Sequence, residues 1–446
     1  MRRVLLTAVA VAPLLALASV AEAACPAAGT ATAGSDITVA SGCTVTPKAN
    51  GDGLILNSSN NITVVAGGTI TNTDASNSVG ILVQGGNSGN VDNQGSISLL
   101  MSYTPTVEGN TGIAGGPFAT GTNRVGIDVI NGALNGNITN ESTGVITIQG
   151  DASTGIFIEK TASLTGNLID NGAISVTGNN TVGINVAGGV GGNVTVGSAI
   201  SANGVGTQGL VTSAAIGGQL TIDSSISATG YRSTTAPTVQ AVLNQLGKDQ
   251  LQQGGSAVVV GGSVANGIAI SAAITTGSGT SATTTPAASV SVFGSAPAMV
   301  IGAAGQNITV GNNTGQAYGL IVGGTVEGAG VYDQQTTPNL PAPASATAIR
   351  IGAAGGTVNL SGGIHVSGSV DATALNAAAT GINILSGVSA QQILNDGQIS
   401  ASVTASTPQT ADALIIASGS HIGSIVNTGT IAAVISDTAS VSGNQA

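Results

Sequence analysis

Few residues in this sequence have the types and spacing that catalytic chemistry needs. Asp128, Asp151 and Glu159 lie close together in the chain, and Lys160 follows directly. Polysaccharide lyases and hydrolases use clustered carboxylates of this kind, often with Ca²⁺ and a basic side chain. We expect only a solvated salt-bridge patch here, because the other cations after residue 23 are dispersed, at Lys48, Arg124, Arg232, Lys248 and Arg350. A β-helical polysaccharide lyase or hydrolase is kept as the alternative function.

Histidine-dependent and nucleophilic chemistry has no better support. His365 and His421 lie in alternating strand or corner contexts and are expected at the surface. A serine protease needs a Gly-Asp-Ser-Gly type motif with a partner histidine, which the sequence lacks. We therefore predict that the chain is not an enzyme and has no catalytic, cofactor or metal site. The chain also contains Asn-x-Thr glycosylation sequons at Asn61, Asn137, Asn193 and Asn307. Asparagine that recurs at the corners of the repeat is sufficient to explain them.

The N-terminal residues predict export. Arg2 and Arg3 precede an apolar run that Pro13 interrupts, and Ala21-Glu22-Ala23 has the small-x-small pattern of a cleavage site. We predict that residues 1–23 are a signal peptide. The only cysteines, Cys25 and Cys43, follow it closely, and in an exported chain they are expected to form a disulfide. This bridge would fasten an N-terminal cap over residues 24–60.

Composition excludes several classes of partner and fold. Without residues 1–23 the chain keeps 6 of its 8 basic residues and 18 of its 19 acidic ones, a net charge of about −12, so no nucleic acid is expected as a partner. Aromatic residues make up only 2% of the chain, while hydrophobic residues make up 42%. A core is therefore available, built from Ile, Val, Leu and Ala. The 69 glycines and many β-branched residues favour strands and tight turns.

Self-similarity is the strongest signal in the chain. Short segments such as Asn61-Ile62-Thr63 and Gly192-Asn193-Val194 recur with an apolar anchor, and the shortest interval between anchors is 26 residues. Longer intervals are expected to carry insertions. The anchors are Ile62, Val91, Ile138, Leu168, Val194, Leu220, Ile268, Ile308, Val358, Ile393 and Ile425.

Each unit contains three short segments in which apolar residues alternate with polar ones. Examples are Gly183-Ile184-Asn185-Val186, Asn193-Val194-Thr195-Val196 and Ile174-Ser175-Val176. Such strands cannot bury themselves alone, but coils of three strands stacked on one another can. We predict an all-β fold, a right-handed parallel β-helix of about 10–11 coils over residues 61–446. A β-sandwich or barrel is the competing fold, and it would not share one register every 26–35 residues.

Four long intervals predict insertions at 101–123, 231–255, 276–296 and 328–345. Each is expected between the third strand of one coil and the first strand of the next, so that all four emerge at one corner of the rod. Apolar residues at helical spacing follow Pro237, which predicts a short amphipathic helix within Pro237–Gln253.

Aromatic and arginine side chains, which are enriched at binding hot spots, gather in these insertions. We predict that they form one partner-binding strip along the rod, and that deleting residues 231–255 weakens adhesion. The residues concerned are Tyr103, Phe118, Arg124, Tyr231, Arg232, Phe293 and Tyr332.

With its signal peptide, scarce cysteine and degenerate Asn-Ile-Thr and Gly-x-Ile-x-Val coils, residues 24–446 resemble the passenger regions of bacterial autotransporters and related β-helical surface adhesins. The resemblance implies display at the cell surface or outer membrane, or release into the medium, through an outer-membrane β-barrel translocator. Such a barrel needs strands of about 10 alternating residues flanked by aromatic girdles. This pattern is missing here, so the translocator is not expected within this chain. The implied partners are ligands on host cells, matrix or neighbouring cells.

Overall fold

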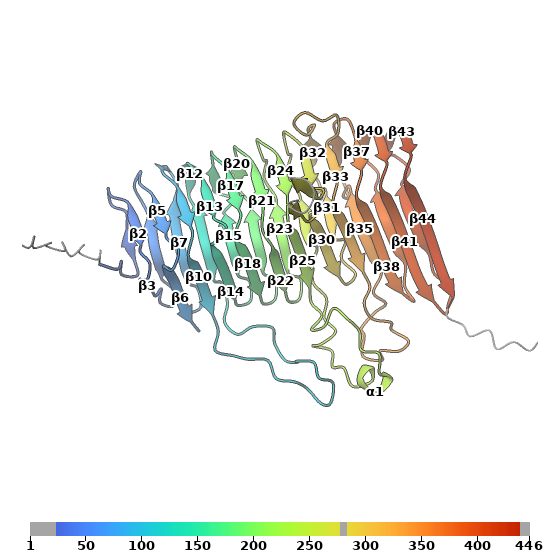
Figure 1. Ribbon diagram of the computed structural model, residues 1–446, viewed down its shortest axis with the longest axis horizontal. Helices are drawn as coiled ribbons and strands as arrows, with labels where there is room; N and C mark the ends of the chain where they lie inside the picture. Colours follow the sequence, from blue (N-terminus) through green and yellow to red (C-terminus); the bar gives the residue numbers. More distant parts are fainter. Residues whose placement is uncertain (1–23, 277–282, 438–446) are drawn as a thin grey trace, which may run out of the picture.

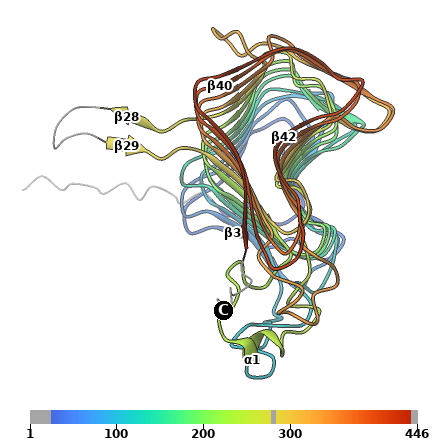
Figure 2. The same cartoon turned by 90° about the vertical axis from the view of Figure 1, so that its right-hand side faces the viewer.

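The chain winds into a rod of stacked coils whose strands line up in long parallel sheets (Figure 1). The structure, a computed structural model, describes residues 24–276 and 283–437. In each coil the chain passes through three main sheets, here named A, B and C, in the same order. Viewed along the rod, the coils superpose into one outline (Figure 2). The predicted parallel β-helix with three main strands per coil is confirmed.

Within the described residues, sheets A and C contain twelve strands each, and sheet B is defined here by twelve strands, one per coil; the two further strands hydrogen-bonded to it lie at a corner of the coil and are described below. Sheet A contains β1 (Thr30–Ala31), β4 (Asp52–Leu56), β7 (Val79–Gln84), β11 (Val125–Ile130), β15 (Thr154–Ile158), β19 (Val182–Val186), β23 (Gln208–Thr212), β26 (Val258–Val260), β31 (Met299–Ile301), β35 (Ala346–Ile351), β39 (Ala379–Ile384) and β42 (Ala411–Ile416). Sheet B contains β2 (Ile37–Val39), β5 (Ile62–Val64), β9 (Val91–Asn93), β13 (Ile138–Asn140), β17 (Leu168–Asp170), β21 (Val194–Val196), β24 (Leu220–Ile222), β27 (Ile268–Ile270), β33 (Leu320–Val322), β37 (Ile364–Val366), β40 (Val388–Asn395) and β43 (His421–Asn427).

Sheet C completes each coil. It contains β3 (Thr44–Val45), β6 (Thr69–Thr73), β10 (Ser96–Leu100), β14 (Val145–Gln149), β18 (Ala173–Thr177), β22 (Ile200–Asn203), β25 (Ser225–Thr229), β30 (Ser289–Phe293), β34 (Thr325–Ala329), β38 (Ser369–Leu375), β41 (Gln398–Ala405) and β44 (Thr430–Asp437). The sheets therefore give twelve coils, one or two more than the repeat predicts. The additional coil is β1–β3, within the predicted cap, where Ile37-Thr38-Val39 pairs in register with Ile62-Thr63-Val64.

The core is a set of apolar ladders, because parallel in-register pairing places equivalent residues directly above one another. On sheet B, Ile62 pairs with Val91 and Val91 with Ile138, and all three side chains are buried. Strand spacing of about 4.8 Å brings consecutive side chains into contact. One continuous cluster of such residues runs from Ile37 to Ala413.

A fourth, shorter ladder lies at the corner between sheets A and B. It begins as a four-stranded sheet of β8 (Asn87–Ser88), β12 (Gly132–Asn135), β16 (Ala162–Leu164) and β20 (Gly189–Val190), and single bridges at Ile216 and Val264 continue it to β32 (Asn307–Val310) and β36 (Thr357–Leu360). The predicted anchors Ile308 and Val358 belong to this ladder, so their assignment to the second strand is wrong. The sheet B register instead runs from Ile268 through Leu320 and Ile364 to Ile393. Asn307-Ile308-Thr309 and Thr357-Val358-Asn359 resemble the second strand because this corner ladder, like sheet B, needs one inward-facing apolar residue in each coil.

Asparagine side chains join successive coils at the start of sheet B. The side-chain oxygen of each accepts a hydrogen bond from the backbone N–H of the equivalent residue in the next coil, at 2.7–2.9 Å. This ladder satisfies corner N–H groups that no strand partner reaches. It explains why sequons recur with the coils. Its members are Asn61, Asn90, Asn137, Asn167 and Asn193, and it ends on the N–H of Gln219.

Three of the four predicted insertions emerge at one corner, between sheets C and A (Figures 1 and 2). The prediction for 276–296 is wrong. This range contains β30, a regular strand of sheet C, and the extra residues form an antiparallel hairpin of β28 (Ile274–Thr276) and β29 (Thr283–Thr285) between sheets B and C. The hairpin projects away from the rod on another side (Figure 2).

The predicted helix is much shorter than its apolar spacing suggests. Only α1 (Gln240–Leu243) is helical, and its N-cap residue, Val239, makes no side-chain capping hydrogen bond. A short segment without a cap has little intrinsic helical stability. Leu243, Leu246 and Leu251 are instead buried among neighbouring loops, and this packing determines the path of the chain.

Candidate functional site

The predicted disulfide is present between Cys25 and Cys43, whose Cα atoms are 5.3 Å apart. It connects the chain before β1 to the residue just before β3, and so closes the first coil. A disulfide of this kind indicates an oxidising, non-cytoplasmic location. The prediction that residues 1–23 are a signal peptide falls outside the described residues.

Removing this disulfide is expected to loosen the first coil locally. The Cys25→Ser, Cys43→Ser double variant should lose about 3 kcal/mol of protection there, because the bridge no longer restricts the unfolded loop. Hydrogen exchange of the β1–β3 amides measures this loss. Amides of β17–β22 serve as the internal control and should not change, since coils interact mainly with their neighbours. Equal loss along the whole rod, or no loss at β1–β3, would contradict the prediction.

The three corner insertions do not present a strip of exposed aromatic anchors. Residues 101–124, 230–257 and 330–345 pack together into one lateral unit, here named the loop body. Tyr231 and Tyr332 are buried inside it, with ring centroids 4.9 Å apart and an edge-on geometry. Leu243, Leu246 and Leu251 pack around them. The prediction that these tyrosines bind a partner directly is therefore not compatible with their burial.

Polar contacts connect all three segments of the loop body. Gln250 donates to the backbone oxygen of Ile113 at 2.8 Å, and Asn339 donates to that of Leu246 at 2.7 Å. The Tyr332 hydroxyl donates to the backbone oxygen of Ser233 at 3.0 Å. Deleting 231–255 alone would expose the surfaces of the other two segments, so such a deletion cannot isolate a binding function.

The other predicted binding residues also serve packing. Phe118 is buried, and the Arg232 guanidinium lies 3.7 Å from its ring centroid while donating to the backbone oxygens of Gly116 and Pro117. Arg124 is fully buried and donates to the backbone oxygens of Ala75 and Gln149, which joins neighbouring coils. Three residues keep partial exposure, Tyr103, Arg232 and Phe293, and Phe293 is the last residue of β30 rather than part of an insertion.

Outward-facing apolar side chains form a row on the outer face of sheet A, although the large apolar residues with the greatest exposure lie elsewhere, among them Val107, Val145 and Ile274. The middle residues of its strands point outward and pair in register, and most of them are apolar. Each is at least half-buried, and the outline of the rod is indented along this sheet (Figure 2). The row is Ile55, Leu82, Asp128, Phe157, Asn185, Val211, Val259, Val300, Arg350, Asn383 and Ile415.

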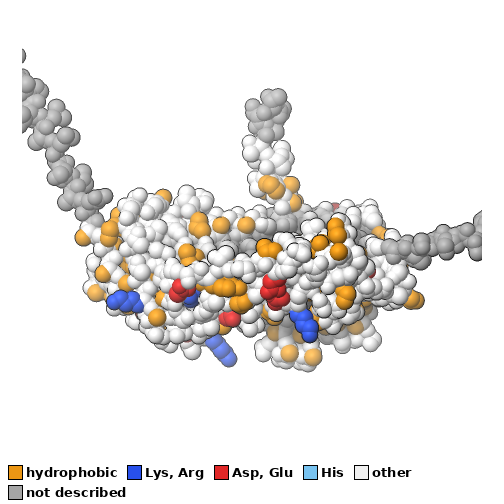
Figure 3. Space-filling view, turned by 90° about the horizontal axis from the view of Figure 1, so that it is seen from below, with side chains coloured by type: hydrophobic (Ala, Val, Ile, Leu, Met, Phe, Trp, Pro, Cys, Tyr) orange, Lys and Arg blue, Asp and Glu red, His pale blue; other side chains and the backbone are white. Residues whose placement is uncertain are grey.

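The outer face of sheet C has the opposite character. Its equivalent row consists of hydroxyl and carboxyl side chains until the last coil: Thr71, Ser98, Thr147, Ser175, Ser201, Ser227, Ser291, Glu327, Asp371, Ser400 and Ala432. Viewed from the loop-body side, the molecule shows few charged groups on a mostly uncharged surface (Figure 3). The predicted alternation of inward apolar and outward polar residues therefore holds for this row of sheet C, whereas the equivalent row of sheet A is mostly apolar.

Two adjoining hollows lie on the sheet A face toward its C-terminal coils. The larger has a volume of about 530 Å³, and the smaller, of about 460 Å³, shares Ala353, Ala354 and Leu385 with it. Arg350 lines the larger hollow, where its Nε atom is buried without a hydrogen-bond partner. Val259 and Val300 form apolar wall beside it. An apolar groove with one unpaired guanidinium is suited to bind apolar groups together with one acidic group.

The predicted salt-bridge patch around Asp128 does not form. Asp128 is buried on sheet A, and desolvation, together with the carboxylates of Glu159 and Asp52, raises its pKa to about 7. Among the described residues, the only ion pair joins His365 to Asp396, at 3.0 Å, so Lys160 does not compensate these carboxylates. His421 is exposed. The sequence could not show that Leu82 and Phe157, the register neighbours of Asp128, bring it out of water.

One pair of carboxylates lies on neighbouring strands of sheet C. Glu327 and Asp371 are register partners, and Glu327 lines a hollow of about 380 Å³ with Phe293. Burial, reinforced by the Asp371 carboxylate, raises the pKa of Glu327. Asp371 accepts hydrogen bonds from Ser369, Gln398 and Ser400.

These features define a class, an acidic parallel β-helix with a lateral loop body and one apolar outer face. Comparison with family models, curated proteins and solved structures gives no match. The class therefore depends on the fold and its surfaces alone. Across residues 24–276 and 283–437, no helix is both long and apolar enough to cross a membrane, and no group of three or more potential metal ligands occurs.

Proposed function

We propose that the chain is an exported scaffold of the cell surface or extracellular space that adheres to partners through the outer face of sheet A. The observation that carries this proposal is the apolar row on that face, which contrasts with the hydroxyl row on sheet C. Contiguous apolar patches on the surface of a folded protein commonly mark sites of interaction with a partner. Leu82 and Phe157 supply apolar contact area, and Arg350 supplies a charge-bearing donor.

Rigidity of the scaffold favours the same conclusion. Parallel ladders hold each outward side chain in a fixed position from coil to coil, so a partner that spans several coils finds a preorganised surface. The loop body lies at one corner of the rod, and its residue Ser256 lines the larger of the two hollows. The resemblance to autotransporter passengers and adhesins supports a surface-displayed role, with an outer-membrane translocator and ligands on host, matrix or neighbouring cells as the proposed partners.

A polysaccharide hydrolase is the second candidate, and Glu327 with Asp371 is the observation that favours it. Glycoside hydrolysis uses two carboxyl groups, and here two lie on adjacent strands, with the pKa of Glu327 raised by burial. An assay for new reducing ends on neutral and acidic polysaccharides separates the two candidates. Turnover that disappears in the Glu327→Gln variant would replace the scaffold proposal with an enzymatic one.

Adhesion of protein-coated beads tests the proposed function. Latex beads carrying the folded chain should attach to cultured cells or to an extracellular-matrix preparation at least several-fold more than albumin-coated beads. Beads carrying the same chain after irreversible unfolding provide the control, because they keep the composition but lose the arranged face. Equal attachment of folded and unfolded chain, or no attachment above albumin, would overturn the proposal.

A further inference from the structure

The two adjoining hollows on sheet A form one continuous groove, here named the Arg350 groove. They share Ala353, Ala354 and Leu385, so a molecule bound in one can extend into the other. Their volumes of about 530 and 460 Å³ are typical of small-molecule sites, which measure about 300–1,000 Å³. The smaller hollow is lined by the turns Ala353–Gly356 and Leu385–Gly387, which carry no charged side chain.

Arg350 is the one charged side chain that lines the groove within the described residues. It is half-buried, its Nε atom has no hydrogen-bond partner, and the single ion pair of this part of the chain joins two other residues. Its register neighbours on sheet A, Val300 and Asn383, are uncharged. A half-buried guanidinium without a counter-charge, in a chain of net charge −11, is suited to bind an anionic group.

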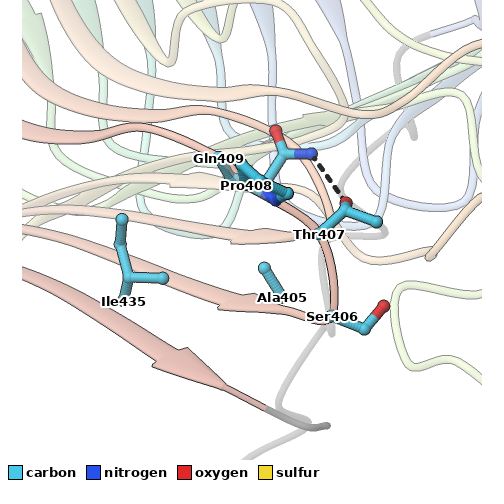
Figure 4. Close-up of a pocket in the computed structure, with 6 residues that line it drawn as sticks. All are labelled: Ala405, Ser406, Thr407, Pro408, Gln409 and Ile435. Atoms are coloured by element: carbon cyan, nitrogen blue, oxygen red, sulfur yellow. Dashed lines mark hydrogen bonds between the residues drawn. The ribbon is translucent and has the colours of Figure 1, made fainter.

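Two other hollows of the rod lack this combination. The hollow between Ile435 and the turn Ser406–Gln409, of about 300 Å³, has no charged side chain in its lining, and Gln409 donates to the Thr407 hydroxyl there (Figure 4). The hollow of about 380 Å³ on sheet C contains the Glu327 carboxylate, which would repel an anion. Of these three sites, only the Arg350 groove has the charge that an anionic ligand requires.

The strands under the groove have few backbone groups to offer a peptide ligand. β26, β31 and β35 each pair with a parallel neighbour on both sides, so their N–H and C=O groups already have partners. A peptide would bury its own backbone groups against Val259, Val300 and Leu385 without hydrogen bonds, which is unfavourable. A hydrocarbon chain has no such groups and gains free energy from the same contacts. The lining therefore favours an alkyl chain over a peptide.

We propose that the Arg350 groove binds a free fatty acid. The carboxylate accepts hydrogen bonds from the Arg350 guanidinium in the larger hollow. Val259 and Val300 contact the carbons next to the carboxylate. The rest of the alkyl chain lies along the turns Ala353–Gly356 and Leu385–Gly387 in the smaller hollow, where it is removed from water.

Equilibrium dialysis of the purified chain against radiolabelled dodecanoate, below its micellar concentration, tests the proposal. One molecule should bind per chain. Affinity should rise about ten-fold from octanoate to decanoate, and about ten-fold again to dodecanoate, because each step buries two more methylene groups. 1-Dodecanol has the same chain without the charge and should bind at least about ten-fold more weakly than dodecanoate. Binding that is independent of chain length, or equal binding of the alcohol, would overturn the proposal.

Substitutions separate the contribution of the carboxylate from that of the chain. Arg350→Gln should weaken dodecanoate binding at least about ten-fold and leave 1-dodecanol binding unchanged, which also shows that the groove is still folded. Leu385→Ser removes apolar surface from both hollows and should weaken both ligands. Lys160→Gln, at an exposed cation outside the groove, is the matched control and should bind both ligands like the parent chain. An Arg350→Gln variant that keeps the affinity of the parent chain for dodecanoate contradicts the proposal.

Photolabelling locates the ligand independently of its affinity. Dodecanoate with a terminal diazirine should label the turns Ala353–Gly356 or Leu385–Gly387, which mass spectrometry of the digested chain identifies. The site shares the sheet A face with the proposed adhesion but does not require it. The Leu82→Asp, Phe157→Asp variant should therefore still bind dodecanoate even where adhesion is lost, since these residues lie on β7 and β15, outside the groove. Labelling around Leu82 and Phe157 instead, or loss of dodecanoate binding in this variant, would show general binding to the apolar row and overturn the proposal.

Discussion

Replacing Asp170 by Asn is expected to raise the stability of the rod at pH 8 by about 4 kcal/mol and to change it little at pH 4. Asp170 is fully buried, and its Oδ1 accepts a hydrogen bond from Asn140, while its Oδ2 has no partner. Desolvation raises the pKa of Asp170 from 3.8 to about 7. The hydrogen bonds from Asn140 and Gly172 lower this pKa, but their effect is smaller than that of desolvation. About three pKa units correspond to about 4 kcal/mol.

The sign of this effect follows from proton linkage. Because the folded pKa is above the unfolded one, Asp170 stabilises the fold fully below about pH 4, and this contribution is lost as the pH rises through about 7. Asn keeps an acceptor for Asn140 without an ionising group. Urea unfolding at pH 4 and pH 8, with hydrogen exchange of β17, measures the change. Asp412→Asn, at an exposed site, is the control. An Asp170→Asn variant that is less stable than the parent chain at pH 8 would contradict the prediction.

A single methyl group at Gly155 is expected to destabilise the middle coils by about 3 kcal/mol. A Cβ at this position would lie 2.4 Å from the backbone oxygen of Gly183 in the next coil and 2.9 Å from the Ile174 side chain. The backbone oxygen cannot move without breaking the parallel pairing of β15 with β19, so the coil must distort. Equivalent glycines in neighbouring coils meet the same restriction, at Gly53, Gly80, Gly126 and Gly183.

Gly189 provides the matched control for this substitution. It also lies in a strand, β20, but its Cβ would meet only the backbone oxygen of Ala215 at 3.6 Å, an ordinary contact. Gly189→Ala should therefore be tolerated within about 1 kcal/mol. Thermal unfolding followed by circular dichroism compares the two variants. Similar midpoints for Gly155→Ala and Gly189→Ala would show that the close approach of coils does not explain the Gly-Ile motif.

Much of the fold follows from local sequence. Period-two alternation predicts the inward ladders, and nine of the eleven predicted anchors lie on sheet B, the exceptions being Ile308 and Val358. Those two fail because any corner of the coil with one inward residue gives the same short pattern. The disulfide is predictable because two cysteines allow one pairing. The Gly-Ile motif is visible as well, although its cause is contact between coils rather than a turn.

The functional surfaces were harder to predict, because they depend on which coils become neighbours. Tyr231 and Tyr332 are far apart in sequence, so their mutual burial could not be derived from composition. The charge of Asp170 suggests an outward position. The alternation that begins at the anchor Leu168 nevertheless points the third residue of Leu168-Ile169-Asp170 inward. One local signal was available for the sheet A face. Triplets such as Ile156-Phe157-Ile158 and Val258-Val259-Val260 lack the polar middle residue that sheet C retains.

Adhesion measured on face-specific variants tests the central claim most directly, that sheet A is the contact face. Leu82→Asp with Phe157→Asp places two carboxylates on the apolar row, and Ser98→Asp with Ser175→Asp places two on sheet C in the same two coils. All four side chains are half-buried and point outward, and circular dichroism and secretion yield verify that both variants fold like the parent chain. The sheet A variant should lose at least ten-fold in bead attachment, and the sheet C variant should attach like the parent chain. Attachment that survives on the sheet A variant and is lost on the sheet C variant would contradict the account.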